Sequence, residues 1–156
     1  MTKSKTSNKL FSEIADELAL SGSGMTRFIE CPTYYLLINH QKSVYSKCFY
    51  INVGLIYKEL LDRNFTADDI GGAFNIKNPT APVHVVFRIG RFPSAPPDLE
   101  REFDRLIAEG AMSELKEILM DALKRLLVFI GDNHDRKTIR KLYDEKKLSA
   151  GIRKEV

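Results

Sequence analysis

The alternation of apolar and polar residues predicts a group of β-strands in the first part of the chain. It is clearest over residues 47–58, where every second residue from Phe49 to Tyr57 is apolar, so these side chains share one face of a strand. Residues 34–42 form a second strand, and residues 43–46 suit a hairpin loop between the two. Shorter strands are expected at 25–31, before Pro32, and at 83–92, where prolines follow.

Apolar residues at helical spacing predict helices on both sides of these strands. Asn8 is expected to cap a first helix, which the Ser-Gly-Ser-Gly run at 21–24 ends. Asp98 is expected to cap a helix that reaches about residue 109, and a second helix with a wide apolar face covers 115–130. Gly131 is expected to end that helix, and Asp135 to cap a third.

Residues 59–78 show no clear periodicity and are interpreted as an irregular insertion or loop. Strands grouped together and helices grouped together are typical of an α+β fold. We therefore expect an antiparallel sheet of about four strands, packed against an N-terminal helix and two to three C-terminal helices. A chain of 156 residues fits one such domain, over residues 8–148, with flexible tails at 1–7 and 149–156.

Composition and charge narrow the classes of function. The polar N-terminus lacks the apolar run of a signal peptide, and the longest apolar run, 126–130, is too short to span a membrane. Together with the absence of any cysteine motif around Cys31 and Cys48, this predicts a cytoplasmic protein with reduced thiols and no membrane partner.

The net charge of +3 hides an uneven distribution of charged residues along the chain. Residues 98–121 hold eight acidic and three basic residues, whereas residues 135–156 hold eight basic and four acidic ones. In the third predicted helix, basic residues stack at one-turn spacing: Arg136, Lys137, Arg140 and Lys141. This basic face is interpreted as the solvated side of a terminal helix. The alternative is a contact with nucleic acid.

Strand periodicity also predicts a polar face on the sheet. If the apolar sets face the helices, the opposite face carries Asn39, Gln41, Tyr50, Asn52, His84 and Arg88. Arg91 follows near the end of the last strand and completes the candidate partner-binding set. Such amide, aromatic and arginine side chains suit a binding surface, and they equally suit a solvated face whose groups pair with one another.

Catalytic signatures are missing from the sequence. It contains no phosphate-binding loop, dinucleotide fingerprint, zinc-protease motif or serine-hydrolase elbow. Its three histidines are scattered, and turn formation explains Asp68 and Asp69, which lie in a loop with glycines. We therefore predict no catalytic residue, no metal ligand and no cofactor, and an enzyme is disfavoured.

Three sequence runs resemble a family of small bacterial domains of unknown function. They are the Asn-His-Gln-Lys-Ser run at 39–43, the Phe-Tyr-Ile-Asn-Val-Gly run at 49–54 and the Arg-Ile-Gly-Arg run at 88–91. The resemblance covers about residues 10–92, and the run at 20–24 departs from the family's usual pattern. It implies a fold rather than an activity, and by analogy with immunity proteins and accessory factors of toxin or anti-phage systems it suggests a protein partner.

The prediction from sequence is accordingly a non-enzymatic module that binds another protein, such as an immunity or defence-accessory protein. One alternative is a nucleic-acid-binding accessory protein that uses the basic C-terminal helix. A second alternative is a small-ligand binder or enzyme that uses the polar sheet face.

Overall fold

The fold is built on one antiparallel sheet, as the sequence predicts. The computed structural model describes residues 6–156, so most of the expected N-terminal tail, residues 1–5, lies outside the described residues. Each strand is hydrogen-bonded to its neighbour in sequence, in the order β1-β2-β3-β4-β5-β6. The strands are β1 (Ser21–Ser23), β2 (Thr26–Glu30), β3 (Tyr34–Lys42), β4 (Phe49–Tyr57), β5 (Val85–Arg88) and β6 (Gly151–Ile152).

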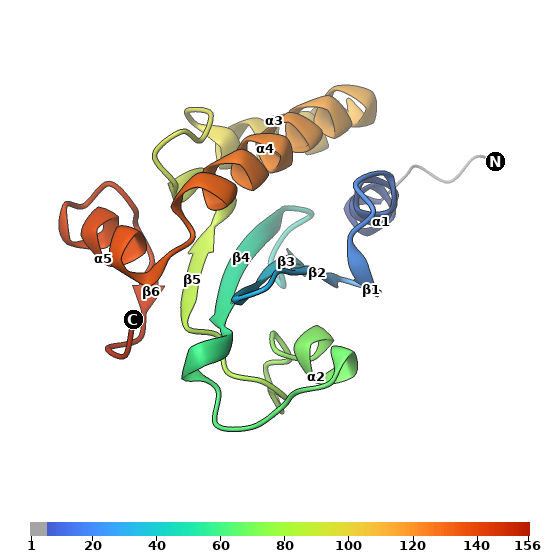
Figure 1. Cartoon of the computed structure of the whole chain (residues 1–156). Helices are drawn as coiled ribbons and strands as arrows, with labels where there is room; N and C mark the ends of the chain where they lie inside the picture. Colours follow the sequence, from blue (N-terminus) through green and yellow to red (C-terminus); the bar gives the residue numbers. More distant parts are fainter. Residues whose placement is uncertain (1–5) are drawn as a thin grey trace.

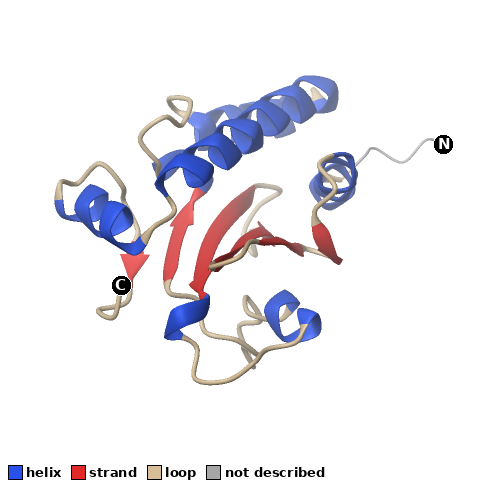
Figure 2. Ribbon diagram, in the orientation of Figure 1, coloured by secondary structure: helices blue, strands red, loops and turns tan. Residues whose placement is uncertain are grey.

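Helices cover the two faces of this sheet unequally. In Figure 1, α1, α3 and α4 lie on one side of the sheet and the short α2 lies on the other, and Figure 2 shows the same layers by secondary structure. The helices are α1 (Ser7–Glu17), α2 (Ala67–Gly71), α3 (Leu99–Glu109), α4 (Met112–Asn133) and α5 (Arg136–Asp144), with single 3-10 turns at η1 (Lys58–Leu60) and η2 (Ile89–Arg91). The α+β prediction is confirmed.

The sheet has six strands rather than about four, because short strands extend it at both edges. β1 has the sequence Ser-Gly-Ser and is fully exposed, so no apolar alternation marks it. It pairs with β2 through a tight turn at residues 24–25. Gly22 in β1 and Gly24 in the turn have φ values of 91° and 67°, a region that glycine adopts without strain. β6 pairs with β5, so the segment expected to be a C-terminal tail contributes a strand.

Helix ends differ from the expected ones at several places, among them the end of α1 at Glu17, before the run at 21–24, and Asp98, which precedes α3 without a side-chain cap hydrogen bond. Thr6, not Asn8, is the N-cap of α1, and its side chain accepts a hydrogen bond from the Lys9 amide. α4 continues through Gly131 to Asn133, since a single glycine weakens a helix without necessarily ending it. Asp135 caps α5 as predicted, with its Oδ1 accepting from the Thr138 amide at 2.7 Å.

The main core lies between the sheet and helices α1, α3 and α4. The β4 residues that the alternation placed on one face are all buried in it: Phe49, Ile51, Val53, Leu55 and Tyr57. From α4, Leu119, Leu126 and Phe129 join the same cluster as Val85 and Phe87 of β5. The predicted apolar pairing of sheet and C-terminal helices is therefore confirmed.

A second, smaller core lies on the other face of the sheet and was not predicted. It forms where the segment between β4 and β5 folds back over Leu37 and Ile56, with Ile70 of α2 fully buried among them. α2 begins with a reciprocal capping box between Thr66 and Asp69, which organises a segment interpreted from sequence as an irregular loop.

Gly54 allows this covering segment to approach the sheet closely. A Cβ at residue 54 would lie 2.8 Å from Val83 Cγ1 and 3.0 Å from Phe74 Cζ. Phe74 therefore packs directly on the backbone of β4. This close contact explains why the Phe-Tyr-Ile-Asn-Val-Gly run ends in glycine, since a larger residue at 54 would clash.

Two neighbouring residues of α4 test the main core. Phe129 is 6% exposed and lies against Phe92, with ring centroids 5.3 Å apart, whereas Val128 is 66% exposed. Phe129→Ala should lower the free energy of unfolding by about 3–5 kcal/mol, because it leaves a cavity in a packed site. Val128→Ala should change it by no more than about 0.5 kcal/mol. Denaturant unfolding of both variants checks this; equal effects would place Phe129 outside the core.

Two glycine substitutions test the second core. Gly54→Ala should destabilise the protein by about 1–3 kcal/mol, since Phe74 and Val83 must move to admit a methyl group. Gly131→Ala should instead stabilise it by about 0.5–1 kcal/mol, because residue 131 is helical and nothing lies within 4 Å of the added atom. The measurement is the thermal midpoint of each variant. A harmless Gly54→Ala change would contradict the close packing of Phe74.

Candidate functional site

The outer face of the sheet, opposite α1, α3 and α4, is polar beyond the second core. Strand register aligns Asn39 with Asn52 and Asn52 with Arg88, and it aligns Gln41 with Tyr50 in the next row. All of these side chains are at least partly exposed. We call them the polar half-face: Asn39, Gln41, Tyr50, Asn52 and Arg88.

A hydrogen-bond network fixes the amides of the polar half-face. Asn52 Nδ2 donates to Asn39 Oδ1 at 3.0 Å and to Gln41 Oε1 at 2.9 Å. Asn39 Nδ2 in turn donates to Thr26 Oγ1 at 2.9 Å and to the Met25 carbonyl at 3.3 Å. The network therefore links β2, β3 and β4 through Thr26 and the three amides, and it holds each amide in one orientation.

Arg88 and Tyr50 form the charged part of the polar half-face. The guanidinium carbon of Arg88 lies 3.9 Å from the centre of the Tyr50 ring, which is a cation–π contact. Within the described part of the chain, no carboxylate or carbonyl accepts a hydrogen bond from Arg88. No Asp or Glu occurs at residues 31–58 or 80–97, so the strands that build this surface carry no acidic residue there.

His84 does not belong to this surface, contrary to the expectation from periodicity. It precedes β5, is only 4% exposed, and its Nδ1 accepts a hydrogen bond from the Tyr57 amide at 2.9 Å. Because His84 lies before the strand begins, the two-residue alternation of β5 does not decide where its side chain points. The imidazole is instead hydrogen-bonded to a backbone amide. Arg91 lies in η2 after the strand has ended and is exposed; residues 90–91 and 98–101 line a hollow at the start of α3.

The two buried histidines serve as packing residues. His40 stacks on Phe49 with ring centroids 5.2 Å apart, lies 5.8 Å from Phe11, and its Nε2 is hydrogen-bonded to Ser7 Oγ at 2.9 Å. Burial lowers the pKa of His40 and of His84 below the usual range for histidine, because removal from water disfavours the charged imidazolium. Both imidazoles are therefore harder to protonate within the fold than in water.

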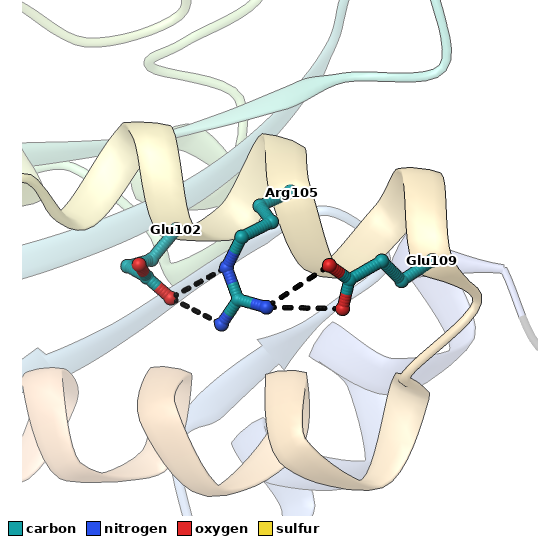
Figure 3. A network of polar contacts seen from close by, with 3 residues as sticks. All are labelled: Glu102, Arg105 and Glu109. Carbon is teal, nitrogen blue, oxygen red and sulfur yellow. Dashed lines mark hydrogen bonds and ion pairs between the residues drawn. The ribbon is translucent and has the colours of Figure 1, made fainter.

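Acidic residues of the helical segment 98–121 are partly paired with basic residues. Figure 3 shows Arg105 between Glu102 and Glu109 on α3, with nitrogen–oxygen distances of 2.7 Å and 3.0 Å. The hydrogen bonds from Arg105 lower the pKa of the Glu102 carboxyl. From α4, Lys116 lies 2.7 Å from Glu17 of α1. Three of the eight acidic residues of this segment, Glu102, Glu109 and Asp121, are thus paired with arginines.

The arginines of the basic helix α5 are also engaged. Arg136 is paired with Glu59 at 3.1 Å and donates to the Glu155 carbonyl. Arg140 donates to the Arg153 carbonyl at 3.1 Å. These contacts hold the segment that contains β6 against α5, so two of the four side chains in the predicted basic face stabilise the fold.

Three further observations concern metal sites, membrane spans and hollows. Among residues 6–156, no group of three or more histidine, cysteine or acidic residues is arranged to hold a metal ion. None of the described helices is both long and apolar enough to cross a membrane. A hollow of about 540 Å³ lies near the start of α1 and the end of α3, lined by other residues than the polar half-face, among them Lys42 and Lys47.

Residues 16–92 match a family model described as Domain of unknown function (DUF4304). The predicted resemblance to a family of domains of unknown function is confirmed for this segment. The match includes the whole polar half-face and the second core, and it ends before α3, α4 and α5. No match to the chain was found among curated proteins or among solved structures.

Sequence reasoning missed one exposed feature beside the polar half-face. The loop between β3 and β4 presents Val44, 89% exposed, and Tyr45, 95% exposed. The Ser43 amide donates to the Cys48 carbonyl at 3.0 Å and the Tyr45 amide to Ser43 Oγ at 3.2 Å, so the loop has its own hydrogen bonds. The only signal in the sequence was a Val-Tyr pair inside an otherwise polar loop.

Stability should fall on mild acidification because of the buried histidines. An unfolded histidine takes up a proton near pH 6.5, whereas His40 and His84 take one up only at lower pH in the fold. The unfolded state therefore binds more protons below about pH 6.5, and stability is lost as the pH falls from 7 to 5. The loss should be at most about 1.4 kcal/mol per pH unit for each histidine.

Denaturant unfolding at several pH values measures this slope. His40→Gln should reduce it, because the titrating group is gone. Ser7→Ala removes the hydrogen-bond partner of His40 but keeps the imidazole, so the slope should persist in this control. An unchanged slope in His40→Gln would show that His40 does not contribute to it.

Proposed function

We propose that this protein is a non-enzymatic module that binds another protein through the polar half-face. The observation that supports this most is Arg88, whose guanidinium lies on Tyr50 and has no acceptor within the described chain. Arginine and tyrosine are enriched among the residues that dominate binding energy at interfaces. A partner with an acidic surface segment would complement Arg88 on a surface that lacks carboxylates.

The amide network supports a binding role because it lowers the cost of association. Asn39, Gln41 and Asn52 are already held in one orientation by their mutual hydrogen bonds. Side chains fixed in advance lose less conformational entropy when a partner binds, by about 0.5–1.5 kcal/mol for each. The three amides are thus positioned in advance, and their unpaired atoms remain available to a partner.

The alternatives have weaker support from the geometry. A nucleic-acid contact through α5 would have to rely on Lys137 and Lys141, since Arg136 and Arg140 hold the C-terminal segment. A contact through the acidic helices would use Glu102 and Glu109, which are paired with Arg105. A small-ligand site on the sheet would need a cavity there, and the hollow of about 540 Å³ lies at the ends of α1 and α3.

A cytoplasmic immunity or defence-accessory protein of a bacterial toxin or anti-phage system is the biological role that we propose for this module. Such proteins act by binding a partner, which agrees with a surface rather than a catalytic pocket as the site. The match of residues 16–92 to a domain of unknown function contains the polar half-face, so a role common to that family could use it.

The proposal is tested with a partner that is first co-purified with the chain and then produced in pure form. Arg88→Ala should weaken binding at least about tenfold while the thermal midpoint stays within about 2 °C, because a hot-spot arginine contributes about 2 kcal/mol or more to binding. Joint substitution of Glu102, Glu109 and Glu117 by Gln should change the affinity less than about twofold.

Loss of the partner in the glutamine variant but not in Arg88→Ala would overturn the assignment of the polar half-face. Unfolding of Arg88→Ala would mark Arg88 as a structural residue instead. Salt-sensitive binding of RNA or DNA that depends on Lys137 and Lys141 would favour the nucleic-acid alternative.

A further inference from the structure

We propose that Arg88 and Gln41 form a receptor for a carboxylate carried on an extended peptide segment, so that the partner's contact is an Asp or Glu side chain. This inference rests on the proposed function and names the chemical group that the polar half-face recognises. Three features of the surface lead to it: the orientation of Arg88, the inventory of free donors and acceptors, and the absence of competing carboxylates.

The Tyr50 ring orients Arg88 for a planar ligand. The guanidinium carbon lies 3.9 Å from the centre of the ring, and no residue among 6–156 accepts a hydrogen bond from its N–H groups, so these donors remain available. Two of them match the two oxygens of a carboxylate, which a guanidinium binds through paired, charge-assisted hydrogen bonds. Stacking on Tyr50 also restricts the long Arg88 side chain before the ligand arrives.

The unused polar atoms of the network define the rest of the ligand. Both hydrogens of Asn52 Nδ2 are committed to Asn39 and Gln41, which leaves Asn52 Oδ1 as an acceptor with no partner among residues 6–156. Gln41 uses its oxygen in the same network, so its Nε2 remains a free donor. These atoms were assigned as the network requires, since each of the two bonds needs an amide donor and an amide oxygen.

Free donors on Arg88 and Gln41 beside a free acceptor on Asn52 suit a group that offers oxygens and an N–H together. A peptide carboxylate provides both, because a backbone amide lies close to every Asp or Glu side chain. A phosphodiester provides oxygens and has no hydrogen-bond donor, so the acceptor on Asn52 favours a peptide over a phosphodiester. Inorganic phosphate at neutral pH carries P–OH groups that can donate to Asn52, but as a single small ion it makes none of the peptide's neighbouring contacts.

The polar half-face itself also offers little for base stacking. Stacking needs open aromatic faces; Arg88 already occupies one face of Tyr50, and the exposed Tyr45 lies in the neighbouring loop rather than on the polar half-face. Lys42 of β3 is paired with the core residue Phe49. Its side chain therefore lies on the face of the sheet opposite the polar half-face. Arg88 is thus the single charge of the polar half-face, which fits one carboxylate better than a chain of phosphates.

Nuclear magnetic resonance of the isotope-labelled full chain tests the inference, with N-acetylated, C-amidated hexaglutamate as the probe. We expect the side-chain Nε–Hε signal of Arg88 and the side-chain amide signals of Gln41 and Asn52 to shift in a saturable way at millimolar peptide. Hexaglutamine, inorganic phosphate and hexathymidylate serve as matched probes and should each bind at least about fivefold more weakly.

Two variants separate a carboxylate fork from a plain positive charge. Arg88→Lys keeps the charge but not the planar fork, and it should weaken the peptide at least about fivefold. Arg105→Lys on α3 is the control and should leave the affinity unchanged, because Arg105 is already paired. Equal affinity of the Arg88→Lys variant, or equal shifts with phosphate or hexathymidylate, would overturn the inference. So would shifts confined to Arg105 or to α5.

Failure of this inference can be told from failure of the proposed function. If a protein partner depends on Arg88 but hexaglutamate shifts none of the three side chains, the binding module stands and the carboxylate receptor is wrong. If hexaglutamate shifts them but the purified partner binds Arg88→Ala normally, the receptor stands and the proposed interface is wrong.

Discussion

The register between β3 and β4 is the constraint on which the rest of the structure depends. It pairs nine residues on each strand, from Tyr34 with Tyr57 to Lys42 with Phe49. Because side chains alternate between faces, this register sends Phe49, Ile51 and neighbouring apolar residues into the main core and the amides to the outer face. A slip by one residue would bury the amides and expose the core, so the burial of the apolar set also fixes where the polar half-face lies.

The covering segment then divides the outer face into two parts. α2 and the chain around it close over Leu37 and Ile56, and Phe74 reaches the backbone of β4 because residue 54 is glycine. The covering segment does not extend to the next pair of residues along the strands, Asn52 and Arg88, and these two side chains are partly exposed to solvent. An outer face that is half core and half polar surface explains how a small antiparallel sheet can be stabilised on both sides and still present an organised surface.

Sequence patterns predicted the parts of this structure that depend on local periodicity. The β3 bounds, the burial of alternate β4 residues and the meeting of Asn39, Gln41, Tyr50, Asn52 and Arg88 all follow from the two-residue repeat of strands. The rest depends on contacts between distant segments. Nothing in the Ser-Gly-Ser run of β1 marks a strand. His84 lies before β5, where its imidazole is buried and accepts a hydrogen bond from the Tyr57 amide. The Thr66–Asp69 capping box was a signal for α2, although its cover of the sheet depends on Gly54 and Phe74.

Hydrogen–deuterium exchange of the chain with and without its purified partner tests the central claim most directly. If the polar half-face is the interface, bound partner should slow exchange in peptides that cover residues 36–54 and 85–91, the strands that build this surface. Peptides from α3 and from the basic helix α5 should exchange at the same rate in both states. Slowed exchange confined to residues 98–121 or 135–147, with β3, β4 and β5 unaffected, would contradict the claim.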